Sequence, residues 1–177
     1  MNLCSKPPTA LLCGLAMMIG MGFAPELQAA DGAVTLLVRH AEKAPESADP
    51  PLTEAGRQRA EHLAGLLRDA RITRVYSTDF ARTRETAGPL ADSLGLEITI
   101  YDPDELDGLA RKIEAAAARS LVVGHSDTIP ALVEKLGGEA GTAIVEATEY
   151  DRLYVLTRTS SGETTTVLLR YGVTRPH

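Results

Sequence analysis

Short apolar runs alternate with longer amphipathic segments along most of the chain. The runs are five or six residues long and rich in aliphatic and β-branched side chains, which is typical of buried strands. They lie at 34–38, 74–78, 97–102 and 120–125. Segments with helical spacing follow them, at 54–70, 79–95, 104–118 and 127–138. This alternation predicts an α/β fold with a largely parallel sheet.

Residues with strong local preferences mark the predicted element ends. Thr53 is a plausible N-cap for the first helix, and Asp104 for the third. The second helix is expected to be interrupted or bent at Gly88-Pro89 and to end at Gly95. Two alternating runs, 152–158 and 164–171, predict a C-terminal antiparallel hairpin. The expected fold is a three-layer sandwich, with a central, mostly parallel sheet flanked by helices.

The first 30 residues have the order of a secretory signal peptide. Lys6 precedes an apolar stretch over 10–23, and small residues follow before Asp31. The sequence therefore predicts a signal peptide at 1–30, a single domain at 31–177, and export to the periplasm or the medium. An uncleaved N-terminal anchor is the alternative, and no stable membrane insertion is expected after cleavage.

Composition narrows the range of partners. The net charge is −6 and aromatic residues make up 4% of the chain, which argues against binding nucleic acid. Both cysteines, Cys4 and Cys13, lie inside the predicted signal peptide, so the mature chain would contain neither a disulfide nor a thiol ligand for a metal. The oligomeric state is not predicted by the sequence.

Polar side chains gather where the predicted strands end. Arg39 and His40 follow the first strand directly, and His125 ends the fourth. In open α/β sheets, ligands bind outside the carboxyl ends of the strands. The other two histidines, His62 in a helix and His177 at the C-terminus, are expected to have no chemical role.

The residues at these strand ends suit an anion better than a cation. Two histidines without cysteine are a weak zinc signal, and neighbouring arginines would repel a metal ion. Arginine instead matches phosphate through paired hydrogen bonds. We therefore expect no metal and no cofactor, and a phosphate pocket built from Arg39, Arg82, His125 and, less firmly, Arg84.

Four segments occur in the order and spacing of a known family. They are "VRHAEK" at 38–43, "LTEAGRQRA" at 52–60, "YSTDFARTRETA" at 76–87 and "VVGHSDT" at 122–128. Together they resemble the histidine phosphatase superfamily, whose members are phosphoglycerate mutase-like.

The resemblance assigns roles to particular residues. It implies that His40 is the nucleophile, that Arg39 and Arg82 clamp the phosphoryl oxygens, and that His125 completes the pocket. Thr53, Glu54 and Gly56 correspond to a helix start behind the pocket, and for these three we favour capping and packing.

Three positions depart from the family pattern or leave it open. Ala41 replaces a frequent glycine and is expected to be tolerated, while Lys43 replaces a frequent hydroxyl residue and either reaches the substrate or is a solvated charge. The general acid is not fixed: Ser126 stands where one branch has aspartate. The favoured candidate is Asp104, within a cluster with neighbouring carboxylates, and the alternatives are Asp102, Glu105, Glu42 and Asp127.

The sequence thus predicts a metal-independent phosphohydrolase that acts on phosphate monoesters through a phosphohistidine at His40. A phosphosugar mutase of the same superfamily and a phosphate-binding module without turnover are the alternatives. The phosphorylated substrate itself is not identified.

Overall fold

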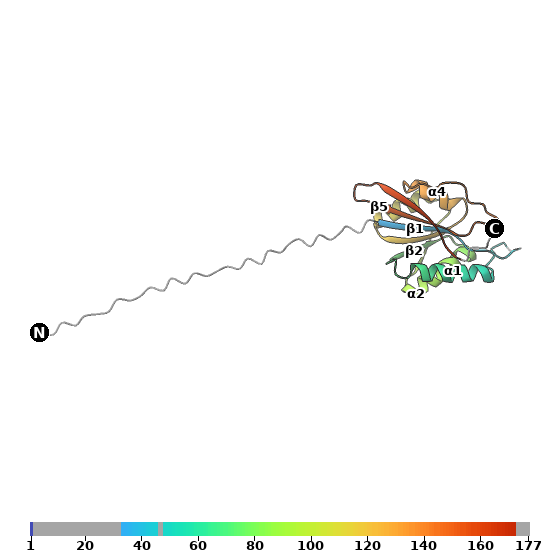
Figure 1. Cartoon of the computed structure of the whole chain (residues 1–177), viewed down its shortest axis with the longest axis horizontal. Coiled ribbons are helices and arrows are strands. Elements are labelled where there is room, and N and C mark those ends of the chain that lie inside the picture. Colours follow the sequence, from blue (N-terminus) through green and yellow to red (C-terminus); the bar gives the residue numbers. More distant parts are fainter. Residues whose placement is uncertain (2–32, 46–47, 173–177) are drawn as a thin grey trace.

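A computed structural model describes Met1, residues 33–45 and residues 48–172 (Figure 1). Apart from Met1, the predicted signal peptide lies outside the described residues, as does His177. In the part of the chain that is described, no helix is long and apolar enough to cross a membrane. The elements are β1 (Ala33–Arg39), α1 (Glu54–Leu67), β2 (Arg74–Ser77), α2 (Ala81–Leu94), β3 (Ile98–Ile100), α3 (Leu106–Ala116), β4 (Arg119–Gly124), α4 (Thr128–Lys135), β5 (Arg152–Arg158) and β6 (Thr164–Arg170).

The six strands form a single sheet in the order β3-β2-β4-β1-β5-β6. The first four are parallel, and the hairpin β5-β6 continues the sheet antiparallel to β1. The predicted α/β sandwich with a C-terminal antiparallel hairpin is confirmed.

Both faces of the central strands are buried, which explains why their sequences are continuously apolar. On β1, Val34, Leu36 and Val38 belong to one hydrophobic cluster together with residues of α1 and α2, such as Leu63. The intervening Leu37 belongs to the cluster on the opposite face, with residues of α3 and α4. Figure 1 shows α1 and α2 on one side of the sheet and α4 on the other.

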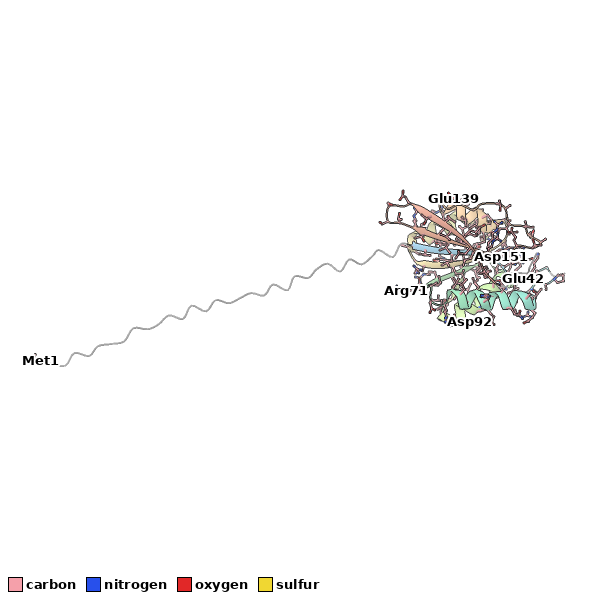
Figure 2. The ribbon with its side chains drawn as sticks, in the orientation of Figure 1. Met1, Glu42, Arg71, Asp92, Glu139 and Asp151 are labelled. Atoms are coloured by element: carbon pink, nitrogen blue, oxygen red, sulfur yellow. The ribbon has the colours of Figure 1, made fainter. Side chains whose placement is uncertain are left out.

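All four parallel strands end at the same edge of the sheet, and β5 begins there because it runs in the opposite direction. Figure 2 shows Glu42, which follows β1, and Asp151, which precedes β5, at one end of the sheet, with Arg71 at the other end. The segments after β1, β2 and β4 and before β5 therefore meet at one place.

Two predicted helix boundaries are confirmed. The Thr53 side chain accepts a hydrogen bond from the backbone N–H of Gly56 at 3.1 Å, which caps the start of α1. At the end of α2, Gly95 adopts a left-handed conformation with φ 64°, which glycine tolerates without steric cost.

Three predicted details differ from the structure. Helix α2 is not interrupted at Gly88-Pro89 but runs through Pro89, because Ala87, Leu90 and Ala91 are buried and hold this segment against the core, and a bend at this point stays a prediction. Helix α3 spans Leu106–Ala116 rather than 104–118, with Glu105 and not Asp104 at the N-cap position. The third strand covers only Ile98–Ile100.

The segment before α3 is a turn instead of a helical cap. The Asp102 carboxylate accepts a hydrogen bond from the backbone N–H of Asp104 at 2.9 Å, and the Asp102 carbonyl accepts one from Glu105 at 3.0 Å. This turn leaves the Asp104 side chain free of a capping role at the carboxyl edge of the sheet.

Candidate active site

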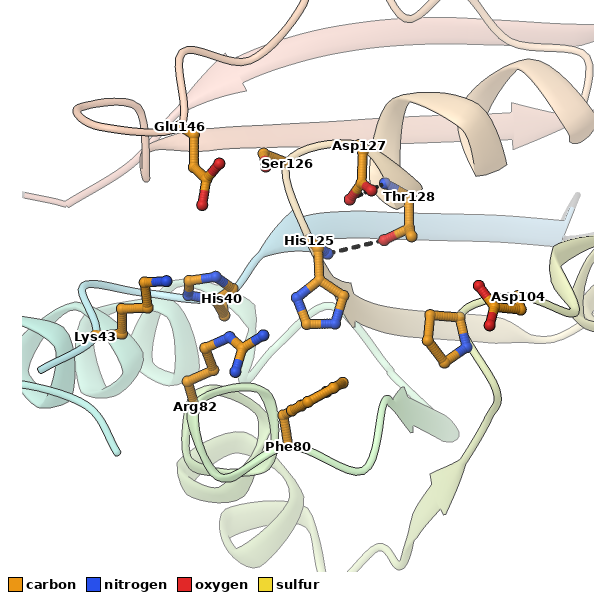
Figure 3. A pocket seen from close by; sticks show the side chains of 11 residues that line it. His40, Lys43, Phe80, Arg82, Asp104, His125, Ser126, Asp127, Thr128 and Glu146 are labelled. Carbon is orange, nitrogen blue, oxygen red and sulfur yellow. Dashed lines mark hydrogen bonds between the residues drawn. The ribbon is translucent and has the colours of Figure 1, made fainter. Parts of the chain in front are cut away.

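A cleft of about 420 Å³ opens at the carboxyl edge of the parallel strands (Figure 3). The segments after β1, β2, β3 and β4 all contribute to it, as does the segment before β5. Its lining residues are His40, Lys43, Phe80, Arg82, Pro103, Asp104, His125, Ser126, Asp127, Thr128 and Glu146.

His40 is held in a fixed orientation at the end of β1. Its backbone N–H donates to the carbonyl of Gly124 at 2.9 Å, and its side chain is 3% exposed. The ring nitrogen Nδ1 lies 2.7 Å from the backbone carbonyl of Ala41. Because a carbonyl oxygen only accepts, Nδ1 carries the proton, and the lone pair of the neutral ring is on Nε2.

The surroundings of His40 keep its ring neutral. Burial lowers the pKa of His40 to about 3, and the positive charges of Arg39 and Arg82 act in the same direction. The hydrogen bond to the Ala41 carbonyl opposes this shift only in part. At neutral pH the residue therefore presents an unprotonated Nε2, which is the form that can act as a nucleophile.

The residues after His40 are locked against α1 and α2. The Ala41 N–H donates to Thr86 Oγ1 at 3.0 Å, and the Glu42 carbonyl accepts from the Thr53 N–H at 2.9 Å. A Cβ on Gly56 would lie 2.3 Å from that same carbonyl, so only glycine allows α1 to approach so closely. This is the capping and packing role favoured for Thr53 and Gly56.

The methyl group of Ala41 fits the structure. It is fully buried in a small cluster with Leu52 and Ala60. The structure therefore accommodates the alanine side chain at a position where the family often has glycine.

The carboxylate of Glu42 is directed away from the cleft. It receives hydrogen bonds from Arg59 Nε and Nη2 at 2.7–3.1 Å, and Arg59 also donates to the carbonyl of Tyr171 at 2.9 Å. Glu42 does not line the cleft, and it connects the nucleophile segment to α1 and to the end of the hairpin.

Arg39 is buried and does not line the cleft. Its guanidinium is buried, and Nη1 donates to the carbonyls of Glu146 and Glu149 at 2.7 and 3.0 Å. The group also stacks on Tyr150, with 4.2 Å between Cζ and the ring centre. Nε and Nη2 have no hydrogen-bond partner of ordinary geometry within 33–45 and 48–172. These two donors belong to a side chain that also interacts with Tyr150 and is not among the residues that line the cleft.

Burial has an electrostatic effect on Arg39 as well. Desolvation lowers the pKa of the guanidinium, while Tyr150 and Glu146 act in the opposite direction. Hydrogen bonds to a bound anion would replace the interactions with water that the guanidinium loses on burial, because charge-assisted hydrogen bonds to arginine are among the strongest in proteins.

Arg82, on the first turn of α2, lines the cleft directly. Its Cζ lies 4.3 Å from the centre of the Phe80 ring, and Nη1 lies 3.8 Å from Asp49 Oδ1. Asp49 also accepts from the Ala81 N–H at 2.9 Å, which caps the start of α2. The Nε atom of Arg82 is buried with no partner among the described residues.

Arg84, the less firmly predicted pocket residue, lies outside the cleft lining. It forms an ion pair with Asp79 on the surface of α2. Lys43 does line the cleft, which favours a contact with the ligand over a purely solvated charge.

His125 faces His40 across the cleft. Their ring centres lie 5.7 Å apart in an edge-on arrangement, and Phe80 contacts the other side of His125 at 5.2 Å. Nε2 of His125 lies 3.0 Å from Thr78 Oγ1. Burial, together with the charge of Arg82, lowers the pKa of His125 to about 4, so this ring is also neutral at pH 7.

Three carboxylates line the cleft, namely Asp104, Asp127 and Glu146. Asp127 caps α4 by accepting from the Thr128 N–H at 2.8 Å. In Figure 3, His125 stands between His40 and Asp104, whereas Glu146 lies on the side of His40 and Lys43. The other predicted acids, Asp102 and Glu105, do not line the cleft.

Comparison with known proteins agrees with this geometry. Residues 35–109 match the sequence model of the histidine phosphatase superfamily, branch 1. The predicted resemblance to the histidine phosphatase superfamily is confirmed. Over 74 residues the chain is 39% identical to a probable phosphoglycerate mutase GpmB of Yersinia pestis (strain Pestoides F) and 38% identical to that of Enterobacter sp. (strain 638). These alignments cover 38% of this chain and 34% of each relative, so the chain spans about a third of the curated relatives that it matches.

Solved histidine phosphatase structures share the fold over most of the chain. The protein histidine phosphatase SixA complexed with tungstate superposes with a TM-score of 0.62 at 22% identity, over 77% of this chain and 96% of that one. The alpha-ribazole phosphatase from Shigella flexneri gives a TM-score of 0.62 at 16% identity, over 80% and 100%. At these identities the likeness establishes the fold alone.

The structure brings together most of the residues that the histidine phosphatase resemblance singled out. The cleft is lined by His40, Arg82, His125, Lys43 and Asp104, whereas Arg39 is buried at the end of β1 and does not line it. His62 is exposed on α1, as expected of a residue without a chemical role. Within the described ranges, no three histidine, cysteine or acidic side chains gather as a metal site.

Sequence reasoning missed Glu146 and Tyr150, which lie in the segment before β5. Their nearness to His40 follows from the antiparallel pairing of β5 with β1, in which Leu153 is opposite Val38. A strand that runs against β1 must begin beside the end of β1. The sequence predicted the C-terminal antiparallel hairpin but not its place beside β1. With that place known, the segment before β5 could have been located near His40.

Proposed function

We propose that this chain is a phosphohydrolase that acts on phosphate monoesters through a phosphohistidine at His40. In the first step Nε2 attacks phosphorus, the P–N bond forms, and the bond from phosphorus to the leaving oxygen breaks. In the second step water attacks phosphorus and breaks the P–N bond, which returns neutral His40 and releases phosphate. The observation that carries the proposal is the hydrogen bond from Nδ1 to the Ala41 carbonyl, because it leaves Nε2 unprotonated beside a cleft.

The arginines support the same proposal. Nε and Nη2 of Arg39 and Nε of Arg82 are buried and have no hydrogen-bond partner of ordinary geometry within the described residues, although Arg39 also interacts with Tyr150. An unpaired buried donor costs about 1–3 kcal/mol. A phosphoryl group would satisfy these donors, and the hydrogen bonds would strengthen as charge develops in the transition state. Because arginines supply the positive charge, the proposal includes activity in the presence of EDTA.

For the general acid we propose Glu146, with Asp104 as the competing assignment. Both carboxylates line the cleft, but Asp104 lies beyond His125 as seen from His40. The Glu146 backbone is fixed to the nucleophile strand by the 2.7 Å hydrogen bond from Arg39. A residue anchored in this way is well placed to protonate an oxygen that leaves phosphorus opposite His40.

The test is phosphate release from an aryl phosphate with EDTA present, for the wild-type chain, His40→Ala and His62→Ala. We expect release by the wild type and by His62→Ala, whose exposed histidine lies on α1, and none by His40→Ala. Equal release by all three would exclude His40 as the nucleophile. Thermal stabilisation by phosphate without any release would instead support a binding module that lacks turnover.

A phosphosugar mutase is the second candidate, because the curated relatives are described as probable phosphoglycerate mutases. A mutase must return the phosphoryl group to its substrate, whereas a phosphatase passes it to water. Incubation with a phosphoglycerate distinguishes the two. Isomer without free phosphate would favour the mutase, and free phosphate would favour the phosphatase.

A further inference from the structure

Two buried threonines connect His125 to the backbone behind the cleft. Thr78 Oγ1 lies 3.0 Å from His125 Nε2 and 2.9 Å from Thr83 Oγ1. Thr83 Oγ1 in turn lies 3.0 Å from the Thr78 carbonyl and 2.9 Å from the Phe80 carbonyl. Neither threonine is exposed to solvent. The two hydroxyl groups must therefore find all their hydrogen-bond partners among these buried atoms.

A count of protons gives the chain of hydrogen bonds a direction. Thr83 has one hydroxyl proton and two carbonyl oxygens within 3.0 Å, so it donates to a carbonyl. Its oxygen then accepts from Thr78, and the oxygen of Thr78 accepts from His125 Nε2. The reverse direction would leave Thr83 Oγ1 facing two carbonyl oxygens with no proton between them.

We propose that Thr83, acting through Thr78, is a positioning residue that fixes His125 as its Nε2–H tautomer. As a consequence, one proton must lie between His125 Nδ1 and a phosphate bound in the cleft. The inference rests on the proposed function, because it concerns how the same cleft holds the phosphoryl group. Thr83 contacts neither His125 nor the cleft itself.

The tautomer determines whether Nδ1, the second ring nitrogen of His125, can donate a hydrogen bond to a bound phosphate. In Figure 3 this nitrogen points across the cleft towards His40 and Arg82. In the neutral Nε2–H tautomer, Nδ1 is an acceptor, and an acceptor that faces a phosphate dianion is repelled by it. Binding therefore requires one proton between them, either on a phosphate oxygen or on Nδ1.

The charges around His125 do not keep its ring protonated before phosphate binds. Arg82, Arg39 and Lys43 each disfavour the imidazolium, and Asp127 favours it. Two further carboxylates, Asp104 and Glu146, line the same cleft. The ring of His40 and the ring of Phe80 contribute no charge at neutral pH. A phosphate dianion that enters the cleft thus takes up its proton from solvent as it binds.

Nuclear magnetic resonance of the full chain with ¹⁵N-labelled histidine reads the tautomer directly and needs no turnover. We expect the proton of free His125 on Nε2 at pH 7 in the wild type and in Thr83→Ser, which keeps the hydroxyl. In Thr83→Val, Thr78 is free to donate to Nε2, and the Nδ1–H tautomer should appear. Ser120→Ala removes a fully buried hydroxyl that makes no hydrogen bond in the described chain and should leave the tautomer unchanged.

Proton uptake on binding inorganic phosphate gives an independent measurement. The second pKa of inorganic phosphate is about 7, roughly one unit above that of a phosphorylated side chain, so the ligand is mostly a dianion at pH 8. Calorimetry in buffers of different ionisation enthalpy should give about one proton taken up per phosphate by the wild type, with affinity falling about tenfold per pH unit above pH 8. Thr83→Val should take up fewer protons, because neutral Nδ1–H is already a donor.

The proposal is overturned if free wild-type His125 carries its proton on Nδ1, or if a folded Thr83→Val keeps the wild-type tautomer and proton uptake. Should Thr83→Val fail to fold, Thr78→Val removes the same link and is read in the same way. These results are separate from those on function. The expected tautomer in a protein that releases no phosphate would refute the phosphatase and leave the positioning role intact.

Discussion

The backbone N–H of His40 donates to the carbonyl of Gly124 at 2.9 Å, so His40 is joined directly to the residue that precedes His125, at the ends of the neighbouring strands β1 and β4. His125 is the next residue after Gly124, and the two imidazole rings consequently lie with centres 5.7 Å apart. Their separation is thus set by the parallel pairing of β1 with β4, in which Arg39 is opposite Gly124. A rigid sheet, rather than a mobile loop, fixes the distance between the proposed nucleophile and its partner.

Arg82 and Arg84 lie two residues apart on α2 and provide a matched pair. Arg82→Ala removes a cleft donor, and since charge-assisted hydrogen bonds contribute about 1.5–3 kcal/mol, kcat/KM should fall at least about tenfold. Arg84→Ala removes only a surface ion pair with Asp79, and kcat/KM should stay within about twofold. Aryl phosphate hydrolysis measures both variants. A folded Arg82→Ala protein of normal activity would remove Arg82 from the proposed pocket.

The two candidate acids can be separated by the leaving group. An alkoxide needs protonation as it leaves phosphorus, whereas a good aryl leaving group needs little. We expect Glu146→Gln to lower hydrolysis of an alkyl phosphate by about 10²-fold while affecting an aryl phosphate much less. Asp104→Asn should affect neither strongly. If the alkyl-selective loss occurs in Asp104→Asn instead, the acid is Asp104 and the assignment of Glu146 is wrong.

The stability of the protein should decrease between pH 7 and pH 5 because of its buried histidines. The pKa of His40 is about 3 in the folded chain, against about 6.5 when unfolded, so below pH 6.5 the unfolded chain binds a proton that the folded chain does not. The free energy of unfolding therefore falls as pH drops below 6.5, by up to about 1.4 kcal/mol per pH unit for this one group.

Urea unfolding at several pH values checks this dependence, with His40→Asn as the comparison. The slope between pH 7 and pH 5 should be smaller in His40→Asn. Glu149 contributes little in this window: its pKa is lowered to about 2 in the folded chain by partners that include the Val145 N–H and Arg152, so its stabilisation is lost only as the pH falls below its unfolded pKa of about 4.5. Equal slopes in the two proteins would show that His40 is not held neutral by the fold.

Two glycines of α1 should respond to alanine in opposite ways. At Gly56 a Cβ would lie 2.3 Å from the Glu42 carbonyl, so Gly56→Ala must displace the nucleophile segment and should cost both stability and activity. At exposed Gly65 a Cβ would meet nothing within 4 Å, and alanine should stabilise the helix by about 0.5–1 kcal/mol. Thermal unfolding of both variants, together with kcat/KM, tests the contrast. Similar changes in melting temperature would contradict the close approach at Gly56.

The sequence by itself determined the order of the elements and the positions of the strongest functional residues. The continuously apolar strands, the Thr53 cap and the Gly95 stop are local signals, and local signals survive in a single sequence. His40 and His125 could be paired in advance because parallel strands place their carboxyl ends at one edge. Boundaries set by competition between neighbouring residues, as at Asp104 and Glu105, were the ones that the sequence misplaced.

Only the tertiary structure decided which distant groups reach these residues. Glu42 is adjacent to the nucleophile segment in sequence, yet Arg59 holds its carboxylate away from the cleft. Glu146 is 106 positions from His40, yet its carbonyl binds Arg39 because β5 runs against β1. The direction of the hydroxyl chain from His125 through Thr78 to Thr83 likewise depends on which carbonyl oxygens surround one buried proton. Such contacts are set by strand pairing and by burial. They bring together groups that are far apart along the chain, so the spacing of these groups in the sequence does not predict the contact.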